Sequence, residues 1–396
     1  MANPAPPAQP QASSTDDGLT LRKFAGLKNT VPAERLGPDE LERAINVDLN
    51  DVGQVSSRRG YTKVNDTPNC SGLFTTDDGD VLAIANGSLV QVLPDYSFAV
   101  LQGGFPVPCP PMAWTQVGPI VYFSCSAISG KLDRRTLQVT PWEGPDVSPA
   151  FAPPGPAIPK RGIWYSPVVN PTSTIGAVGG RLLGPPPLAT TLAYFNGRIY
   201  MGQGRHVWAT ELYNYDYVDK TRNFWTFEAD VTMIGAVSDG LYVGTDEGVW
   251  FISGETFAKM GRRRVMDFGA IRGSMVYVPA ELANPPQVSL DAATEVKVSI
   301  LFLTHEGYCG GQDGGTCYNY TEAKFIFPNV EGAAALFRRQ EGVNQYLAVT
   351  NSGGTPSANA RIGDWVDAQI LRKGNWQTSC EKVRFGDSVS AVVNPG

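Results

Sequence analysis

The stretch "SDGLYVGTDEGVWFISG", residues 238–254, has the pattern of two short strands joined by a tight turn. Apolar residues alternate on either side of the central "TDEG", and glycines stand where a turn often requires a left-handed backbone. Comparable paired-strand units occur at residues 77–93, 117–139 and 195–212. The recurrence of this unit predicts an antiparallel, all-β protein.

The spacing of the units favours a β-propeller. Successive units begin roughly 40 residues apart, which is the length of one four-stranded blade, except for a gap at residues 143–190. A sandwich built from hairpins is the alternative architecture. The C-terminal third is also expected to be β, with strands at "EVKVSILFLT", "AKFIFP", "AAALFRR", "QYLAVT" and "WVDAQILRK".

Composition agrees with a turn-rich β protein. The 396 residues include 43 glycines and 31 prolines, and only 18% of the residues are charged. The net charge of −6 argues against a general nucleic-acid coat but leaves room for a local basic patch. Residues 1–18 lack the basic and apolar regions of a signal peptide, and no apolar run is long enough to predict a membrane span.

Three parts are expected along the chain. Residues 1–20 predict a flexible Pro-rich arm, residues 21–64 a docking helix and hairpin, and residues 65–396 a β-propeller-like body. Eleven prolines in residues 145–187 are too many for a central strand. We therefore expect this part of the body to be an extended connection lying over the outside of the blades.

A short helix is predicted after Gly37. Pro38 suits the first helical position, and the two acidic residues that follow suit the positive end of the helix dipole. Leu41 and Ile45 would then lie on one apolar face. This helix is expected to be two or three turns long at most.

The stretch "AINVDLNDVGQVSSRRGY", residues 44–61, predicts a hairpin. Val47 and Leu49 point to one side of the first strand and Asp48 to the other, as in a half-buried strand. Gly53 can adopt the left-handed conformation that closes the turn. The stretch contains no nucleophile, histidine or cysteine, so it does not indicate catalysis.

Two basic clusters stand out: Arg58 with Arg59 after this hairpin, and the triplet Arg262, Arg263 and Arg264. A run of charge is most often a solvated face. The alternatives are contact with a polyanion such as DNA or with an acidic partner surface.

The sequence offers little catalytic chemistry. The two histidines, His206 and His305, are far apart in sequence and no G-x-S-x-G motif occurs. His305 with Cys309 and Cys317 could supply three zinc ligands, but the spacing of the cysteines is not that of a zinc knuckle. The two thiols could instead close their loop as a disulfide or stay reduced.

A glycan hydrolase is an alternative class, because "TDEGVW" at residues 245–250 approaches the sialidase Asp-box, S/T-x-D-x-G-x-x-W. Its aspartate and tryptophan are each misplaced by one position. Asp239, Asp246 and Glu247 are therefore more simply interpreted as turn residues. We expect no enzyme activity and assign no catalytic residue, metal or cofactor.

The stretch "FAGLKNTVPAERLGPDELERAINVDLNDVGQVSSRRGYTKV", residues 24–64, resembles the N-terminal signature of tail proteins from short-tailed bacteriophages. The matching features are "GLKN", "PAERL", "NVD" with the hairpin glycine, and "RRGY". Residues 194–254 resemble the propeller core of the same family, and "AAALFRRQEGVNQYLAVT" and "GDWVDAQILRKG" resemble its C-terminal end. The longer Pro-rich N-terminus and the cysteine loop at residues 305–317 depart from that pattern.

This resemblance implies a structural protein of the virion, the tail hub or tail nozzle. Such subunits form a ring, hexameric by resemblance, below the portal and the head-to-tail adaptor (the head-tail connector), and they retain packaged DNA and conduct it during DNA ejection. Distal needle, fibre or tailspike proteins would be further partners. The protein would be assembled in the bacterial host cytoplasm and reside in the tail. The alternative is a peripheral tail propeller that binds a host receptor or glycan.

Within this framework each candidate residue has an expected role. The interface candidates of the docking element are Leu41, Ile45, Asp48, Arg58 and Arg59. The charged members of this set would fix the register with a neighbouring subunit or the adaptor by pairing with opposite charges. The triplet Arg262, Arg263 and Arg264 is expected to face double-stranded DNA and contact it transiently.

Overall fold

The structure is a computed structural model of the whole chain. It describes residues 24, 26–42, 47–49, 55–57, 70–144, 164–165, 182–279, 298–321, 324–327, 330–340, 343–352, 366–372 and 380–385. The predicted arm at residues 1–20 and most of the Pro-rich connection at residues 145–187 lie outside these ranges.

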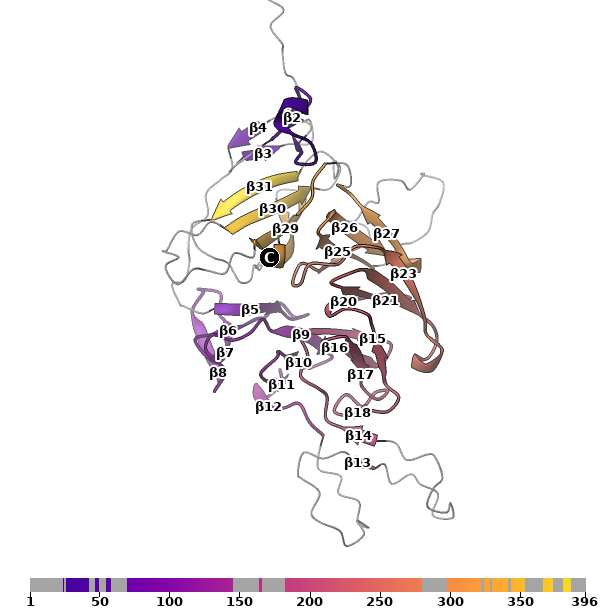
Figure 1. Cartoon of the computed structure of the whole chain (residues 1–396). Coiled ribbons are helices and arrows are strands. Elements are labelled where there is room, and N and C mark those ends of the chain that lie inside the picture. Colours follow the sequence, from indigo (N-terminus) through magenta and orange to yellow (C-terminus); the bar gives the residue numbers. More distant parts are fainter. Residues whose placement is uncertain are drawn as a thin grey trace, which may run out of the picture.

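The protein is an all-β propeller. In the described part of the chain, six antiparallel sheets have four strands each, and in every one the strands are paired in the order in which the chain makes them. The sheets follow one another around a common centre (Figure 1). We call them blades 1 to 6.

The strands of blades 1 to 3 have the following bounds. They are β5 (Cys70–Thr75), β6 (Val81–Ala85), β7 (Ser88–Val92) and β8 (Phe98–Gly103); β9 (Ala113–Val117), β10 (Ile120–Ser124), β11 (Ser129–Asp133) and β12 (Gln138–Pro141); and β15 (Thr191–Phe195), β16 (Arg198–Gln203), β17 (His206–Ala209) and β19 (Phe224–Thr226). A small sheet of β13 (Trp164–Tyr165), β14 (Leu182–Gly184) and β18 (Val218–Asp219) accompanies blade 3.

Blades 4 to 6 are built in the same way. Their strands are β20 (Val231–Val237), β21 (Gly240–Thr245), β22 (Val249–Ser253) and β23 (Gly261–Met266); β24 (Val276–Pro279), β25 (Val298–Thr304), β26 (Gly307–Gln312) and β27 (Thr316–Asn319); and β28 (Val330–Gln340), β29 (Val343–Ser352), β30 (Val366–Arg372) and β31 (Cys380–Phe385). The described helical segments are three-residue 3-10 turns, namely η1 (Ala33–Arg35), η2 (Phe257–Lys259) and η4 (Asp313–Gly315).

The four hairpin units predicted from the sequence are confirmed. Each contains the second and third strands of a blade: β6 and β7, β10 and β11, β16 and β17, and β21 and β22. The central strands of blades 2, 3 and 4 are covered on both faces by neighbouring blades. Every residue of β21 is buried, for example. Central strands therefore show the strongest apolar pattern in the sequence.

The core is divided among the interfaces between blades. Between blades 4 and 5, Tyr242 and Phe251 pack with Ile300 and Phe302. A separate cluster joins blades 5 and 6, and Leu27 from the N-terminal segment is buried in it. Burial of apolar area between neighbouring blades is thus the main stabilising contribution to the fold.

The turn between the second and third strands is repeated in blades 4 and 5. Thr245 and Thr304 each place a hydroxyl against the carbonyl of the glycine three residues later, Gly248 and Gly307, at 3.0 and 3.1 Å. Both threonines are buried. The resemblance of "TDEGVW" to an Asp-box thus reflects this structural turn, and Asp246 and Glu247 are turn residues as predicted.

The predicted helix after Gly37 is wrong. Instead, the Gly37 carbonyl accepts the Glu40 N–H at 3.0 Å, and the Glu40 carboxylate accepts the Gly37 N–H at 2.9 Å and the Lys28 ammonium at 2.8 Å. This turn leads into β2 (Glu40–Leu41), which pairs in parallel with β1 (Gly26–Leu27). Long-range pairing has overridden local helical signals.

One of the five C-terminal strand predictions is also wrong. Residues 324–327, within "AKFIFP", form an irregular connection between blades 5 and 6. Their apolar side chains fill the cluster between these blades, with Phe325 and Phe327 buried. The other four runs fall on β25, β28, β29 and β30.

Candidate docking and binding surfaces

The predicted hairpin is present where the structure describes it. β3 (Val47–Leu49) and β4 (Val55–Ser57) pair antiparallel, with Asp48 opposite Ser56. The hairpin is separate from the six blades, and β3 lies beside β31 of blade 6 (Figure 1). Three interface candidates, Ile45, Arg58 and Arg59, lie outside the described residues.

The segment before the hairpin is bound to the connection between blades 5 and 6. The side-chain amide of Asn29 donates to the Ile326 carbonyl at 2.8 Å and its oxygen accepts the Ile326 N–H at 2.9 Å. The Asn29 N–H also donates to the Lys324 carbonyl at 2.9 Å. We call residues 26–41 the N-terminal strap. It bridges blades 5 and 6 and precedes the hairpin of β3 and β4, which in turn precedes blade 1.

Leu41, the described apolar interface candidate, belongs to this strap. It is partly buried and packs with Leu27 against the cluster between blades 5 and 6. The side chain therefore contacts the chain's own body, and its contact with another subunit stays a prediction.

The arginine triplet lies on β23, the outermost strand of blade 4. Arg262 donates to the Thr226 carbonyl of blade 3 at 2.8 Å and lies 5.6 Å from the centre of the Phe227 ring. Arg263 points to the opposite neighbour and donates to the Gly314 carbonyl at 2.8 Å. These two guanidinium groups thus join blade 4 to both adjacent blades.

Arg264 remains within blade 4. It donates to the Glu247 carbonyl at 2.8 Å, pairs with Asp267 at 3.1 Å and lies 5.8 Å from the centre of the Trp250 ring. All three arginines are exposed. Intramolecular contacts therefore account for part of the triplet's role, and its contact with DNA stays a prediction.

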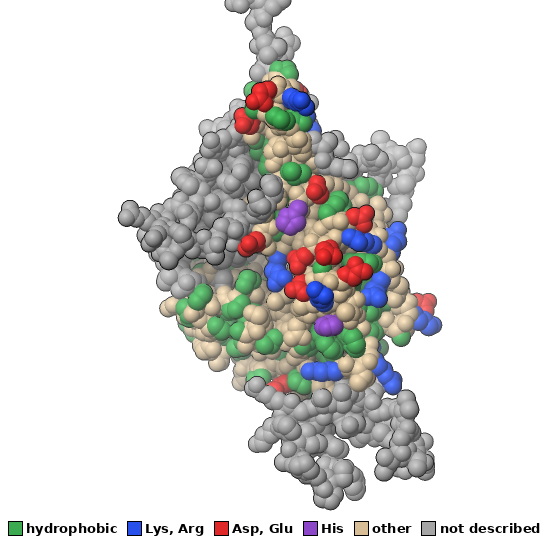
Figure 2. Space-filling view, in the orientation of Figure 1, with side chains coloured by type: hydrophobic (Ala, Val, Ile, Leu, Met, Phe, Trp, Pro, Cys, Tyr) green, Lys and Arg blue, Asp and Glu red, His purple; other side chains and the backbone are tan. Residues whose placement is uncertain are grey.

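Both histidines lie on one face of the molecule, where acidic and basic side chains are interspersed (Figure 2). His206 begins β17, and its Nδ1 is 3.1 Å from the Thr226 hydroxyl. His305 lies in the turn between β25 and β26, where its Nδ1 is 3.2 Å from the Phe327 carbonyl. Within the described ranges, no group of three His, Cys, Asp or Glu side chains is arranged to hold a metal.

Cys309 and Cys317 are not joined by a disulfide. Cys309 is paired with Asn319 across β26 and β27, whereas Cys317 is paired with Gly311. The Cys317 sulfur lies 3.3 Å from the Met266 sulfur of blade 4, and burial raises the pKa of this thiol to about 12. The Cys317 thiol therefore packs against blade 4.

Among the described residues, no helix is long and apolar enough to cross a membrane.

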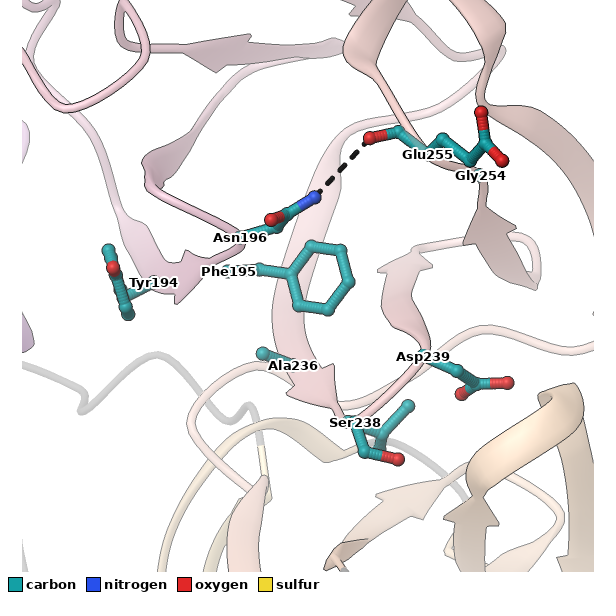
Figure 3. A pocket seen from close by; sticks show the side chains of 9 residues that line it. Tyr194, Phe195, Asn196, Ala236, Ser238, Asp239, Gly254 and Glu255 are labelled. Carbon is teal, nitrogen blue, oxygen red and sulfur yellow. Dashed lines mark hydrogen bonds between the residues drawn. The ribbon is translucent and has the colours of Figure 1, made fainter.

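An open cleft lies between blades 3 and 4, at the end of the strands opposite His206. Its volume is about 740 Å³. It is lined by two hairpin turns and by the end of β22, with the residues Tyr194, Phe195, Asn196, Ala236, Val237, Ser238, Asp239, Gly254 and Glu255. Figure 3 shows the Phe195 ring between the Asn196 side and the Ser238–Asp239 side of the cleft.

The cleft wall from blade 4 is held by blade 5. The Asp313 carboxylate accepts both the N–H and the hydroxyl of Ser238, and the Asp239 carboxylate accepts the Gly314 N–H at 2.8 Å. The Tyr277 hydroxyl accepts the Ala236 N–H at 3.2 Å. These bonds fix the turn that carries Ser238 and Asp239.

The cleft wall from blade 3 is a tight Asn-Gly turn. Asn196 and Gly197 both have positive φ, 44° and 74°, as a two-residue hairpin turn requires. The Asn196 amide donates to the Glu255 carbonyl at 3.4 Å, the dashed line in Figure 3. Sequence reasoning identified these turns but not the cleft, because its walls come from blades that are adjacent only in the folded protein.

Comparison with known proteins gives no family assignment. No family model and no curated protein matches the chain. Among solved structures, the N-terminal domain of Nup159 has a TM-score of 0.43 at 11% identity, covering 84% of this chain and 93% of that one. Virginiamycin B lyase from Staphylococcus aureus has a TM-score of 0.40 at 11% identity, covering 81% and 85%. Similarity at this level carries no functional argument.

Proposed function

We propose that the protein is a structural subunit of a short bacteriophage tail, forming a ring below the portal and adaptor as a tail hub or nozzle. The proposal rests on the resemblance of residues 24–64 and 194–254 to that family. The observation that supports it best is the hairpin of β3 and β4, which is separate from the blades and preceded by a strap bound to blades 5 and 6.

A separate element on a rigid body is suited to docking. The bonds between Asn29 and Ile326 tie the base of the docking element to the propeller body. An element held in this way loses less conformational entropy when a neighbour binds than a free segment would. The neighbour proposed here is an adjacent subunit or the head-to-tail adaptor, with distal tail proteins and DNA as further partners.

DNA contact is proposed to be transient. The net charge of −6 disfavours tight binding of DNA along the whole surface. A small exposed cationic strip is formed by Arg262, Arg263 and Arg264. A few phosphate contacts per subunit would hold the polymer at low salt and release it readily. Peripheral placement, with binding to a host receptor or glycan, remains the alternative function.

Charge reversal of the docking element tests the proposal. The double variant Arg58→Glu, Arg59→Glu is expected to leave the blades folded, because both residues precede the first strand of blade 1, which begins at Cys70. Its incorporation into particles should fall sharply, since like charges at an interface repel. Particle-associated protein is measured by mass spectrometry of gradient-purified virions.

The matched control is Arg135→Glu combined with Arg205→Glu, which reverses two exposed arginines on the blades. This control should be incorporated like the wild type. Equal incorporation of the Arg58→Glu, Arg59→Glu variant would show that these arginines do not dock the subunit.

A further inference from the structure

We infer that Cys109 and Cys125 are a reactive thiol pair, which a small disulfide oxidant such as oxidised glutathione converts into an internal disulfide. Cys109 lies in the connection between blades 1 and 2, and Cys125 directly follows β10, in the turn that leads to β11. The Cys109 thiol donates a hydrogen bond to the Cys125 sulfur. Both side chains pack in one hydrophobic cluster with Phe105 and Phe123.

The two segments that carry these thiols are both held on that cluster. Phe105, which precedes Cys109 in the connection, is buried, and its ring lies 5.8 Å from the Phe123 ring. The Cys125 N–H donates to the Ile128 carbonyl at 2.8 Å, which closes the turn after β10. A disulfide joins its sulfurs at about 2.05 Å. Because the two sulfurs are already in hydrogen-bond contact, forming the bond requires only local movement.

Burial gives the two thiols different roles. Cys109 is partly exposed, whereas Cys125 is 0% exposed, so an oxidant in solvent reaches Cys109 first. The Cys109 thiolate attacks one sulfur of oxidised glutathione and displaces one glutathione thiolate. The Cys125 thiol then loses its proton and attacks the Cys109 sulfur of this mixed disulfide, which releases the second glutathione. Two protein thiols are oxidised, and one glutathione disulfide is reduced to two thiols.

The cysteine pair that is close in the sequence does not share this arrangement. Cys309 is paired with Asn319 across β26 and β27 rather than with Cys317. Cys309 is also buried, at 1% exposure, so an oxidant in solvent does not reach it. The structure therefore favours a disulfide between Cys109 and Cys125 over one between Cys309 and Cys317.

Oxidation is expected to be slow at neutral pH and to accelerate as the pH rises. Burial, and next the neighbouring Cys125 thiol, raises the pKa of Cys109 to about 11. Because the thiolate is the attacking species, the rate should rise about tenfold per pH unit up to about pH 10. A rate that levels off above about pH 9 would indicate an ordinary thiol with a pKa of about 8.5, which contradicts the contact between Cys109 and Cys125.

The test is incubation of the purified chain with oxidised glutathione, followed by acid quenching and alkylation of the remaining thiols with N-ethylmaleimide. Chymotrypsin cleaves after Trp114, between the two cysteines, and mass spectrometry maps the peptides. We expect a peptide pair linked through Cys109 and Cys125, lighter by two hydrogen atoms than the reduced peptides and separated by dithiothreitol. Cys125→Ala removes the second thiol, so Cys109 should accumulate as its mixed disulfide with glutathione. Cys109→Ala should leave Cys125 reduced.

Cys70→Ala is the matched control, because Cys70 is also partly exposed. This variant should form the disulfide at the wild-type rate. Three further results would overturn the inference: alkylation of both Cys109 and Cys125 in the oxidised wild type, linkage of Cys109 to another cysteine, or no glutathione adduct on Cys109 in Cys125→Ala. The reaction takes place within one chain, so none of these results bears on ring formation or on the proposed tail function.

Discussion

Replacing Tyr242 by alanine is expected to lower the free energy of unfolding by about 3–5 kcal/mol, the range for deleting a large buried aromatic side chain. Tyr242 is fully buried between blades 4 and 5, at 0% exposure. Its ring packs directly on Gly311, where an added Cβ would come within 2.7 Å of a ring carbon. No side chain on Gly311 is available to fill the space that alanine would leave.

The Tyr242 hydroxyl also contributes to the free energy of unfolding through its hydrogen bonds. It lies 2.5 Å from the Gln312 carbonyl and 2.9 Å from the Thr316 carbonyl, so it bridges the loop that carries η4. Tyr242→Phe keeps the ring and removes only this donor, which should cost about 1–2 kcal/mol. The two variants therefore separate packing from hydrogen bonding.

The measurement is equilibrium unfolding in guanidinium chloride, followed by tryptophan fluorescence. We expect the midpoint to fall in the order wild type, Tyr242→Phe, Tyr242→Ala. An alanine variant as stable as the phenylalanine variant would contradict the account. It would mean that the Tyr242 ring contributes no stability by packing between blades 4 and 5.

The second large effect is expected at the N-terminal strap. Leu27→Asp would place a carboxylate in the cluster between blades 5 and 6, where Leu27 is only 2% exposed. Burying an unpaired charge costs several kcal/mol, so the strap should detach rather than keep the carboxylate buried. The hairpin of β3 and β4 would then lose its anchor while blades 2 to 4 remain folded.

Hydrogen exchange measured by mass spectrometry detects detachment of the strap directly. Amides of residues 26–41 and 324–327 should lose protection, whereas β21 and β22 should keep theirs. Leu212→Asp is the control, because it introduces the same charge at a side chain that is 51% exposed. Unchanged protection of residues 26–41 in Leu27→Asp would show that the strap is not held by Leu27.

The sequence predicted those parts of the fold that are contiguous and covered on both sides. The hairpin of β21 and β22 is an example: both strands lie within seventeen residues, and burial leaves a continuous apolar pattern. Outer strands show a weaker apolar pattern in the sequence than central strands do. Residues 261–266 show a basic cluster in the sequence and no strand pattern, because the three successive arginines of β23 are exposed and break the alternation of apolar and polar residues.

Contacts between segments that are distant in the sequence could not be predicted from the sequence alone. Helix-start signals around Pro38 are genuine, but pairing of β2 with β1 and the bond between Lys28 and Glu40 favour a turn. The link from Asn29 to Ile326 joins residues that are 297 positions apart in the sequence. The cleft likewise joins two turns from different blades. All of these depend on contacts between segments that are separated in the sequence, which local propensity does not encode.

The most direct test of the proposed tail function is the stoichiometry of the purified chain, alone and mixed with the portal and adaptor proteins. Mass photometry and electron microscopy measure the mass and symmetry of the assemblies. The account predicts closed rings of six copies, six times the 42.6 kDa chain, seated on the axis of the adaptor. A chain that stays monomeric in every mixture, or attaches only at the periphery, would contradict it.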